Sequence, residues 1–199
     1  KEFHEYAAQY LKDKFGYAMG DVGSLFVFGL VNTFLQVFYT DTLGITPLIV
    51  MLIMIIARVW DAINDPLWGR VVDKAKCKKP GTKYKRWLVY LALPLAISAV
   101  LMFINVKSLG FTTGQTIAYA SVSYVLFGML YTGTNIPYGS MASVVTTDDK
   151  ERNSLSVWRS VGSTLGGFGP MILSFLAYDA KKLNHTKLII GASILAVLC

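Results

Sequence analysis

The sequence predicts an all-α membrane protein that crosses the bilayer several times. Of its 199 residues 54% are hydrophobic and 16% are charged, whereas soluble domains carry about 25% charged residues. Uncharged stretches of 19, 20, 40 and 19 residues follow Asp21, Arg86, Lys107 and Arg159. A membrane-spanning helix needs about 20 mostly apolar residues, so each stretch can hold a span. The composition excludes a soluble enzyme domain, a disordered tail and a nucleic-acid-binding arm.

Taken in order, the apolar windows predict five complete spans and a sixth that is cut short. The expected spans are residues 15–39, 47–72, 87–106, 114–145, 155–178 and 187–199. Glycine-containing turns at residues 41–44 and 109–110 separate neighbouring spans. The fourth window is long and contains Pro137, which predicts a kink or unwinding near its end. Only 12 residues follow Lys187, so we expect a truncated sixth helix and a chain that is a fragment.

The basic residues predict which ends of the spans face the cytoplasm, because Lys and Arg are retained on that side. With the N-terminus inside, 14 basic residues lie on the inner side and 4 on the outer side. We therefore expect a multi-pass protein of the cell (inner, cytoplasmic) membrane with a cytoplasmic N-terminus. The net charge of +7 follows from this asymmetry beside anionic lipid, so we expect the lipid bilayer as a partner and no nucleic acid.

One helix face within the second span carries three ionisable residues. At 100° per residue Asp61 and Asp65 share a stripe with Arg58, and Asn64 lies beside it. A charge at bilayer depth costs at least ~2.5 kcal/mol, so these groups must be paired or hydrated in a cavity. Two carboxylates and one guanidinium leave the stripe one cation short of neutral, which predicts a site for Na⁺ or H⁺. The alternative is a structural salt bridge between helices.

Further polar residues at depth are weaker indications of a cavity. Asp21 lies near the start of the first span, and Tyr131, Thr132 and Asn135 come just before Pro137 in the fourth. Such residues line cavities or bond neighbouring helices. We expect no cofactor and no enzyme activity, because no His, Ser or Cys stands at depth with a base in reach.

These residues and their surroundings resemble a known transporter family. The chain closely resembles the glycoside-pentoside-hexuronide:cation symporters, the melibiose-symporter-like branch of the major facilitator superfamily. The resemblance is strongest at residues 58–69 and in the basic loop at 73–87. Three further stretches match the same family, residues 15–21, 38–44 and 148–152. The resemblance implies that the chain is the six-helix N-terminal half of a major facilitator fold with its sixth helix truncated. It also implies that substrate binds between this half and the protein's own C-terminal half.

Carried onto matching positions, the resemblance assigns roles to individual residues. The cation site corresponds to Asp61, Asn64, Asp65 and Thr132, with Asp61 and Asp65 as ligands of a Na⁺ ion if the coupling ion is sodium. Gly69 and Asp73 resemble the superfamily's loop motif, whose Asp latches one gating state.

The substrate positions match the family only in part. The sugar-contacting carboxylates of melibiose transporters fall at Leu25 and Asn135, and a stacking Trp falls at Gly139, whereas Tyr131 and Arg159 are kept. Asp21 lies one turn from Leu25 and is expected to take over part of the polar role. The candidate substrate-binding residues are Asp21, Tyr131, Asn135 and Arg159.

Together these features predict a secondary active transporter. We expect Na⁺ or H⁺ to drive symport of a sugar, glycoside, pentoside or hexuronide, because a cation at Asp61 and Asp65 would neutralise the second span. The alternatives are a lipid or amphiphile transporter on the same scaffold, and a membrane sensor or partner-binding subunit.

Overall fold

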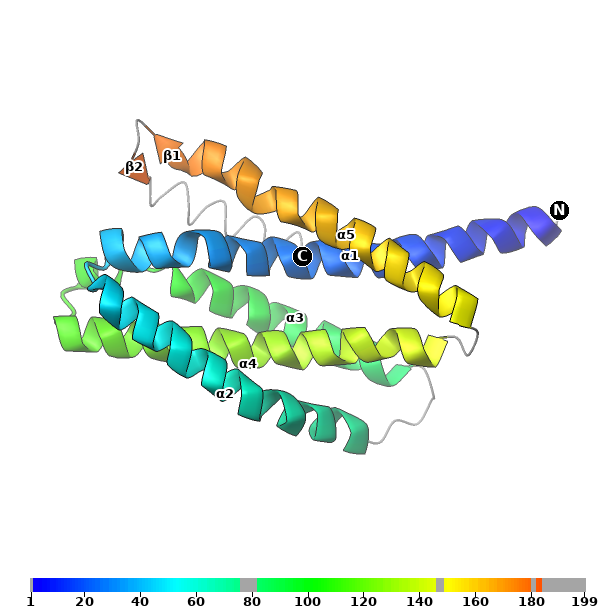
Figure 1. The fold of residues 1–199 in the computed structure, drawn as a ribbon, viewed down its shortest axis with the longest axis horizontal. Coiled ribbons are helices and arrows are strands. Elements are labelled where there is room, and N and C mark those ends of the chain that lie inside the picture. The colour runs from blue at the N-terminus through cyan, green and yellow to red at the C-terminus, as the bar shows by residue number, and fades with distance from the viewer. Residues whose placement is uncertain (1, 76–81, 146–148, 180–181, 184–199) are drawn as a thin grey trace.

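Five long helices run side by side along the molecule (Figure 1). The structure is a computed structural model that describes the chain except residues 1, 76–81, 146–148, 180–181 and 184–199. The long helices are α1 (Glu2–Val37), α2 (Pro47–Lys74), α3 (Thr82–Met102), α4 (Thr113–Val145) and α5 (Asp149–Ala177). The short elements are the π-helix η1 (Phe38–Thr42), the 3₁₀ helix η2 (Val106–Leu109) and the strands β1 (Tyr178–Asp179) and β2 (Lys182–Leu183).

Helices occupy the first five apolar windows of the sequence, and the sixth window lies outside the described residues. Lys14–Thr42 and Pro47–Lys74 are both long and apolar enough to cross a membrane, with mean hydropathies of 1.6 and 1.8. Arg86–Met102 is a shorter apolar helix. Helix α4 is uncharged, but many of its side chains are polar, which suits a helix that lines a cavity.

Two connections owe their shape to glycine. Gly44 and Gly110 have φ angles of 65° and 87°, in the left-handed region that favours a residue without Cβ. Gly44 lies between η1 and α2, and Pro47 then occupies the first turn of α2, where its fixed φ suits the helix. The predicted breaks at Gly44 and Gly110 are confirmed, but residues 41 and 42 still belong to η1, so the first turn begins later than expected.

One sequence expectation needs correction. Helix α4 is continuous through Pro137, so it does not unwind there, whereas the expected kink stays a prediction. A proline removes only one helical hydrogen bond, and neighbouring helices support the rest.

The described residues are helical almost throughout, in line with the expected all-α membrane fold. The strands β1 and β2 have two residues each and pair antiparallel, with Tyr178 opposite Leu183 and Asp179 opposite Lys182. This short pair does not form a layer.

The helices form two groups that meet in a core at one end of the bundle. Helix α5 packs along α1, whereas α4 packs against both α2 and α3 (Figure 1). The largest fully buried side chains include Phe34, Phe38, Tyr39 and Phe103. The rings of Phe38 and Phe103 meet edge to face at 5.4 Å, and the Tyr39 hydroxyl donates to the Ala120 carbonyl at 3.1 Å. This aromatic core ties α1 to α3 and α4 through η1.

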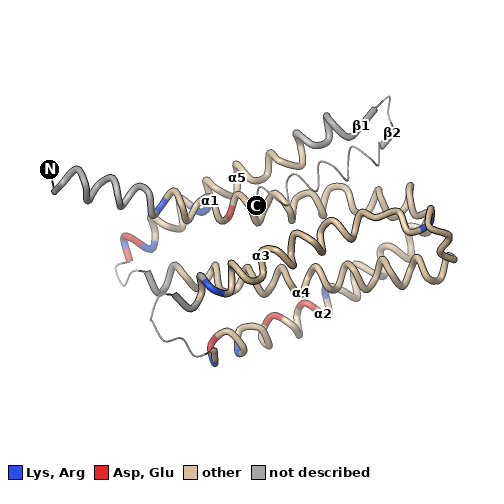
Figure 2. The backbone as a smooth tube through the Cα atoms, turned by 180° about the vertical axis from the view of Figure 1, so that it is seen from behind, with Lys and Arg blue, Asp and Glu red and all other residues tan. Residues whose placement is uncertain are grey.

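Charged residues gather at the other end of the bundle (Figure 2). Helices α1, α3 and α5 begin there and α2 and α4 end there. Its described basic residues include Lys14, Arg70, Lys74, Arg86, Lys150 and Arg152. Lys107 lies at the opposite end, in η2. The charge asymmetry found along the sequence is therefore an asymmetry between the two ends of the bundle.

Candidate functional site

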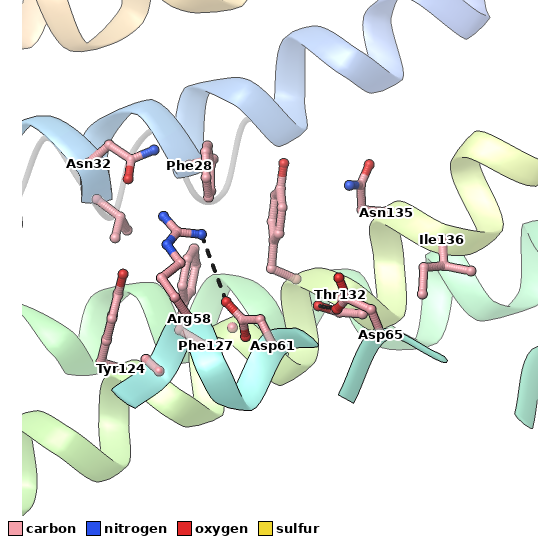
Figure 3. A pocket seen from close by; sticks show the side chains of 14 residues that line it. Phe28, Asn32, Arg58, Asp61, Asp65, Tyr124, Phe127, Thr132, Asn135 and Ile136 are labelled. Atoms are coloured by element: carbon pink, nitrogen blue, oxygen red, sulfur yellow. Dashed lines mark hydrogen bonds and ion pairs between the residues drawn. The ribbon is translucent and has the colours of Figure 1, made fainter. Parts of the chain in front are cut away.

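A polar pocket opens between α1, α2 and α4 near the middle of the bundle (Figure 3). Its volume is about 160 Å³, well above the ~30 Å³ that one water molecule occupies in the liquid. The lining residues are Phe28, Val31, Asn32, Ala57, Arg58, Asp61, Asp65, Tyr124, Phe127, Gly128, Tyr131, Thr132, Asn135 and Ile136. Three of them are charged, and they are the stripe predicted on the second span.

Helix α2 supplies all three charged groups of this pocket. Arg58 Nη1 lies 3.8 Å from Asp61 Oδ2, an ion pair between residues three apart on one helix face (Figure 3). The Arg58 side chain is 58% exposed and that of Asp61 is 26% exposed. The pair is therefore loose, and it leaves the negative charge of Asp65 uncompensated within the described lining.

Helix α4 faces these carboxylates with one hydroxyl and one glycine. The Thr132 hydroxyl donates to Asp65 Oδ1 at 2.9 Å. A Cβ added at Gly128 would lie 3.0 Å from Asp61 Oδ1, so the absent side chain makes room for the carboxylate. Gly128 and Thr132 lie one helical turn apart, which lets a single face of α4 contact both acids.

Two predicted substrate residues line the same pocket. Tyr131 and Asn135 lie one turn apart on α4, and the Tyr131 ring stacks on Phe28 of α1 with centroids 4.7 Å apart. Asn64 is placed differently: it is 4% exposed, is not among the lining residues of this pocket, and its Nδ2 has no hydrogen-bond partner among the described residues.

Asp21 and Arg159 form a second polar cluster, between α1 and α5. Arg159 Nε donates to Asp21 Oδ1 at 3.2 Å, and the Ser163 hydroxyl donates to Asp21 Oδ2. The Asp21 side chain is 7% exposed and that of Arg159 is 37% exposed. The Arg159 guanidinium also lies over the Tyr138 ring, 5.2 Å from its centroid. Neither Asp21 nor Arg159 is among the lining residues of the pocket around Asp61 and Asp65.

The structure thus separates the predicted site residues into groups. Arg58, Asp61, Asp65, Tyr131, Thr132 and Asn135 share one pocket, and Asp21 pairs with Arg159 beside it. Gly69 and Asp73 lie in the last turns of α2 as helical residues. The sequence analysis did not predict three residues that contact these groups: Gly128, Tyr138 and Ser163. Ser163 could have been predicted, because it follows Arg159 by one helical turn. The contacts of Gly128 with Asp61 and of Tyr138 with Arg159 depend on how the helices pack.

The positions that depart from the melibiose transporters lie near these groups. Leu25 lines a groove between α1 and α5 together with Phe28 and Ser163. A Cβ at Gly139 would lie 3.7 Å from Arg159 Nη1, an ordinary contact that leaves room beside the guanidinium.

Comparison with known proteins places the chain in a family. Residues 16–199 match the family of MFS/sugar transport proteins. The chain belongs to this family. The MFS/sugar transport family consists of membrane transporters, so the protein is membrane-embedded, and the resemblance drawn from the second span is confirmed.

Individual members of the MFS/sugar transport family are similar along most of this chain. It is 36% identical to the inner membrane symporter YicJ of Escherichia coli over 163 residues, which are 82% of this chain and 34% of YicJ. It is 34% identical to the isoprimeverose transporter of Lactiplantibacillus pentosus over 168 residues, 83% of this chain and 34% of that protein. The chain therefore spans about a third of the length of these relatives.

Proposed function

We propose that the chain is the N-terminal half of a secondary active transporter that couples Na⁺ or H⁺ movement to transport of a sugar, glycoside, pentoside or hexuronide. The observation that carries this proposal is the pocket with Arg58, Asp61 and Asp65 between apolar helices. Its formal charge is −1, and a surplus charge at bilayer depth is costly. Binding of one cation removes the surplus.

The ligand chemistry suits a hard cation or a proton. Carboxylate and hydroxyl oxygens are ligands for hard ions, and Asp61, Asp65 and Thr132 supply them from two helices. We also propose Asn64 as a member of the cation site, because it lies on α2 next to Asp65. Since Asn64 is buried outside the pocket lining, its side chain would turn toward the pocket when the cation binds. The names of similar proteins, a symporter and an isoprimeverose transporter, support sugar symport.

The substrate would approach the face where the two polar clusters lie next to each other. Tyr131 offers an aromatic ring and Asn135 an amide to sugar hydroxyls, while Arg159 supplies guanidinium donors from a side chain that is 37% exposed. Asp21, which is nearly buried, would hold Arg159 in place. The C-terminal half would supply the opposite wall and would rock against this half, with Gly69 and Asp73 in the gating segment.

An uptake assay with the complete transporter tests the proposal. Cells are offered isoprimeverose, a hexuronide and an alkyl glycoside, each with and without a Na⁺ gradient and an inward proton gradient. Gradient-stimulated uptake of isoprimeverose or the hexuronide supports sugar symport. Uptake of the alkyl glycoside alone favours the amphiphile transporter, and no uptake of any probe favours a sensor or partner-binding subunit.

The orientation is a separate part of the proposal. The charged end of the bundle in Figure 2 would face the cytoplasm, in line with the retention of basic residues on that side. Cys77 belongs to the basic segment between α2 and α3 and lies outside the described residues. In a complete transporter in which every other cysteine is replaced by serine, an impermeant thiol reagent should leave Cys77 unlabelled in intact cells and label it after permeabilisation. Ready labelling in intact cells would reverse the topology.

A further inference from the structure

The ring of Tyr138 lies at the junction of three helices. It belongs to α4 and is 4% exposed. On one face it stacks on Tyr17 of α1, with centroids 4.8 Å apart and planes 13° apart. The guanidinium of Arg159, from α5, lies over the same ring at 5.2 Å. One aromatic side chain therefore connects α1, α4 and α5.

The position of this ring is strongly determined by its surroundings. The Tyr138 hydroxyl donates to the backbone carbonyl of Tyr17, which holds the far edge of the ring. Gly20 makes room for one side of the same end, because a Cβ there would lie 2.7 Å from Tyr138 Cε2. Stacking, a hydrogen bond and a glycine gap together leave the ring little freedom.

Arg159 is held by partners in several directions. Asp21 accepts from its Nε, which fixes one edge of the guanidinium. The Tyr17 side chain also interacts with Arg159, and the Tyr138 ring attracts the guanidinium by a cation–π contact, with the guanidinium carbon 5.2 Å from the ring centroid. An edge contact alone permits rotation about the hydrogen bond, so the ring is expected to help set the plane.

The same helix face that carries Tyr138 also lines the pocket around the carboxylates. Tyr131, Asn135 and Tyr138 recur at intervals of four and three residues, which places them on one stripe of α4. Thr132, beside that stripe, donates to Asp65. A movement of α4 that accompanies cation binding would therefore move the ring on which the Arg159 guanidinium lies.

We propose that Tyr138 is a positioning residue for substrate recognition, setting the plane of the Arg159 guanidinium and linking it through α4 to the carboxylate pocket. This inference rests on the proposed function, in which Arg159 contacts the substrate. Tyr138 would not touch the sugar itself.

Replacement of the ring tests the inference in the complete transporter, with the panel sugar that is taken up fastest. Tyr138→Leu should raise the KM for that sugar about tenfold, the loss expected for a cation–π contact that is partly exposed, as the Arg159 side chain is. It should also reduce the factor by which the coupling cation lowers that KM. Tyr138→Phe keeps the ring and should stay within about twofold of the wild type.

The chain offers a matched control on the same helix. Tyr119 also lies on α4, donates to a backbone carbonyl, that of Leu101 at 2.7 Å, and meets an aromatic ring, that of Phe111. Its partners are not basic residues, so Tyr119→Leu should leave the KM within about twofold. Equal effects of Tyr119→Leu and Tyr138→Leu would overturn the inference, as would a Tyr138→Phe variant as impaired as Tyr138→Leu.

A double-mutant cycle separates this inference from the proposed function. If the ring acts through Arg159, adding Tyr138→Leu to Arg159→Gln should change the KM less than about twofold, because the cation of the contact is already gone. Additive effects would overturn the inference. An unchanged KM for Arg159→Gln alone would instead contradict the proposed role of Arg159 in substrate binding.

A second variant displaces the ring without removing it, in case Tyr138→Leu does not reach the membrane. Gly20→Ala should push on Tyr138 and raise the KM severalfold. Gly16→Ala, one turn earlier on α1, has no atom within 4 Å of the added Cβ and should behave as the wild type. Equal KM values for the two alanine variants would overturn the inference.

Discussion

The two carboxylate clusters inside the bundle differ in how their charge is balanced. Between α1 and α5, one acid meets one base: Asp21 is nearly buried and accepts from Arg159 and Ser163. Between α2 and α4, two acids share one base, and the Arg58 contact to Asp61 is 3.8 Å long and largely exposed. A balanced pair needs no ligand, whereas a surplus carboxylate at bilayer depth does. The comparison therefore favours the pocket between α2 and α4 as the place where the proposed coupling cation would bind.

The helices around the two carboxylate clusters also pack differently: α1 and α5 pack closely, whereas α2 and α4 meet through polar side chains. A Cβ at Gly162 or Gly166 would collide with the α1 backbone at Ala18 or Val22, so α5 packs backbone against backbone on α1. Helix α4 meets the acids of α2 through Gly128 and the hydroxyl of Thr132. The first interface is close and its Asp21–Arg159 pair is neutral, while the second is mediated by polar side chains that a ligand can rearrange.

Removal of one pocket carboxylate should have the largest effect. Asp65→Asn keeps the volume of the side chain and an oxygen that can accept from Thr132, but it loses the charge that attracts the cation. We expect stimulation of uptake by Na⁺ or H⁺ to fall at least about tenfold, equivalent to ~1.4 kcal/mol, with protein level maintained. Asp61→Asn should act in the same direction.

Asp41→Asn is the matched control for these variants. Asp41 also accepts from a threonine hydroxyl, that of Thr40 at 2.9 Å, but it is exposed in η1. Its stimulation ratio should equal that of the wild type. If Na⁺ or H⁺ stimulates uptake by Asp65→Asn and Asp61→Asn as much as by the wild type, the pocket carboxylates do not bind the coupling cation.

Breaking the balanced pair should affect stability more than coupling. Asp21→Ala leaves Arg159 without its carboxylate, and loss of one partner from a buried pair costs about 3–5 kcal/mol. Because Arg159 is 37% exposed, we expect about 2 kcal/mol, measured as a lower thermal unfolding temperature in detergent. Asp149→Asn, which breaks an exposed 4.0 Å pair with Arg152, should cost less than about 0.5 kcal/mol. A similar small shift for both variants would show that the Asp21 pair is not structural.

Thr132→Val tests one contact of the pocket, because valine has nearly the same volume as threonine but lacks the hydroxyl that donates to Asp65. The lost hydrogen bond to Asp65 costs about 1 kcal/mol, so the cation concentration for half-maximal stimulation should rise about fivefold. Thr134→Val is the control, because the Thr134 hydroxyl donates to the Tyr131 backbone carbonyl at 2.8 Å. Equal shifts for the two variants would assign the effect to α4 itself and not to the carboxylate.

The smallest effect is expected at Gly128. A Cβ there would lie 3.0 Å from Asp61 Oδ1, and the carboxylate can turn away by a few tenths of an ångström. Gly128→Ala should therefore lower the apparent cation affinity about two- to threefold, less than 1 kcal/mol. Gly114→Ala, with no atom within 4 Å of the added Cβ, should not change it. An unchanged affinity in Gly128→Ala would mean that Asp61 is not confined by α4.

The helix positions and the acidic stripe on α2 could be predicted from the sequence, because both depend only on residues that are close to each other in the chain. Uncharged stretches such as residues 22–40 mark spans by length alone. The helical repeat places Arg58, Asp61 and Asp65 on one face whatever the rest of the chain does. Likewise, the left-handed turns at Gly44 and Gly110 follow from residues next to each other in the chain.

Only the tertiary structure decided which partner each of these groups meets. Thr132 reaches Asp65 from 67 residues away, and Arg159 reaches Asp21 from 138 residues away. No local periodicity encodes such contacts, because they depend on which helices pack together and on the glycines that let them approach. From the sequence alone both Asp21 and Asp65 were acids within a span, the first a candidate substrate contact and the second a candidate cation ligand. Packing made Asp21 half of a closed ion pair and left Asp65 in a pocket with a negative charge to spare.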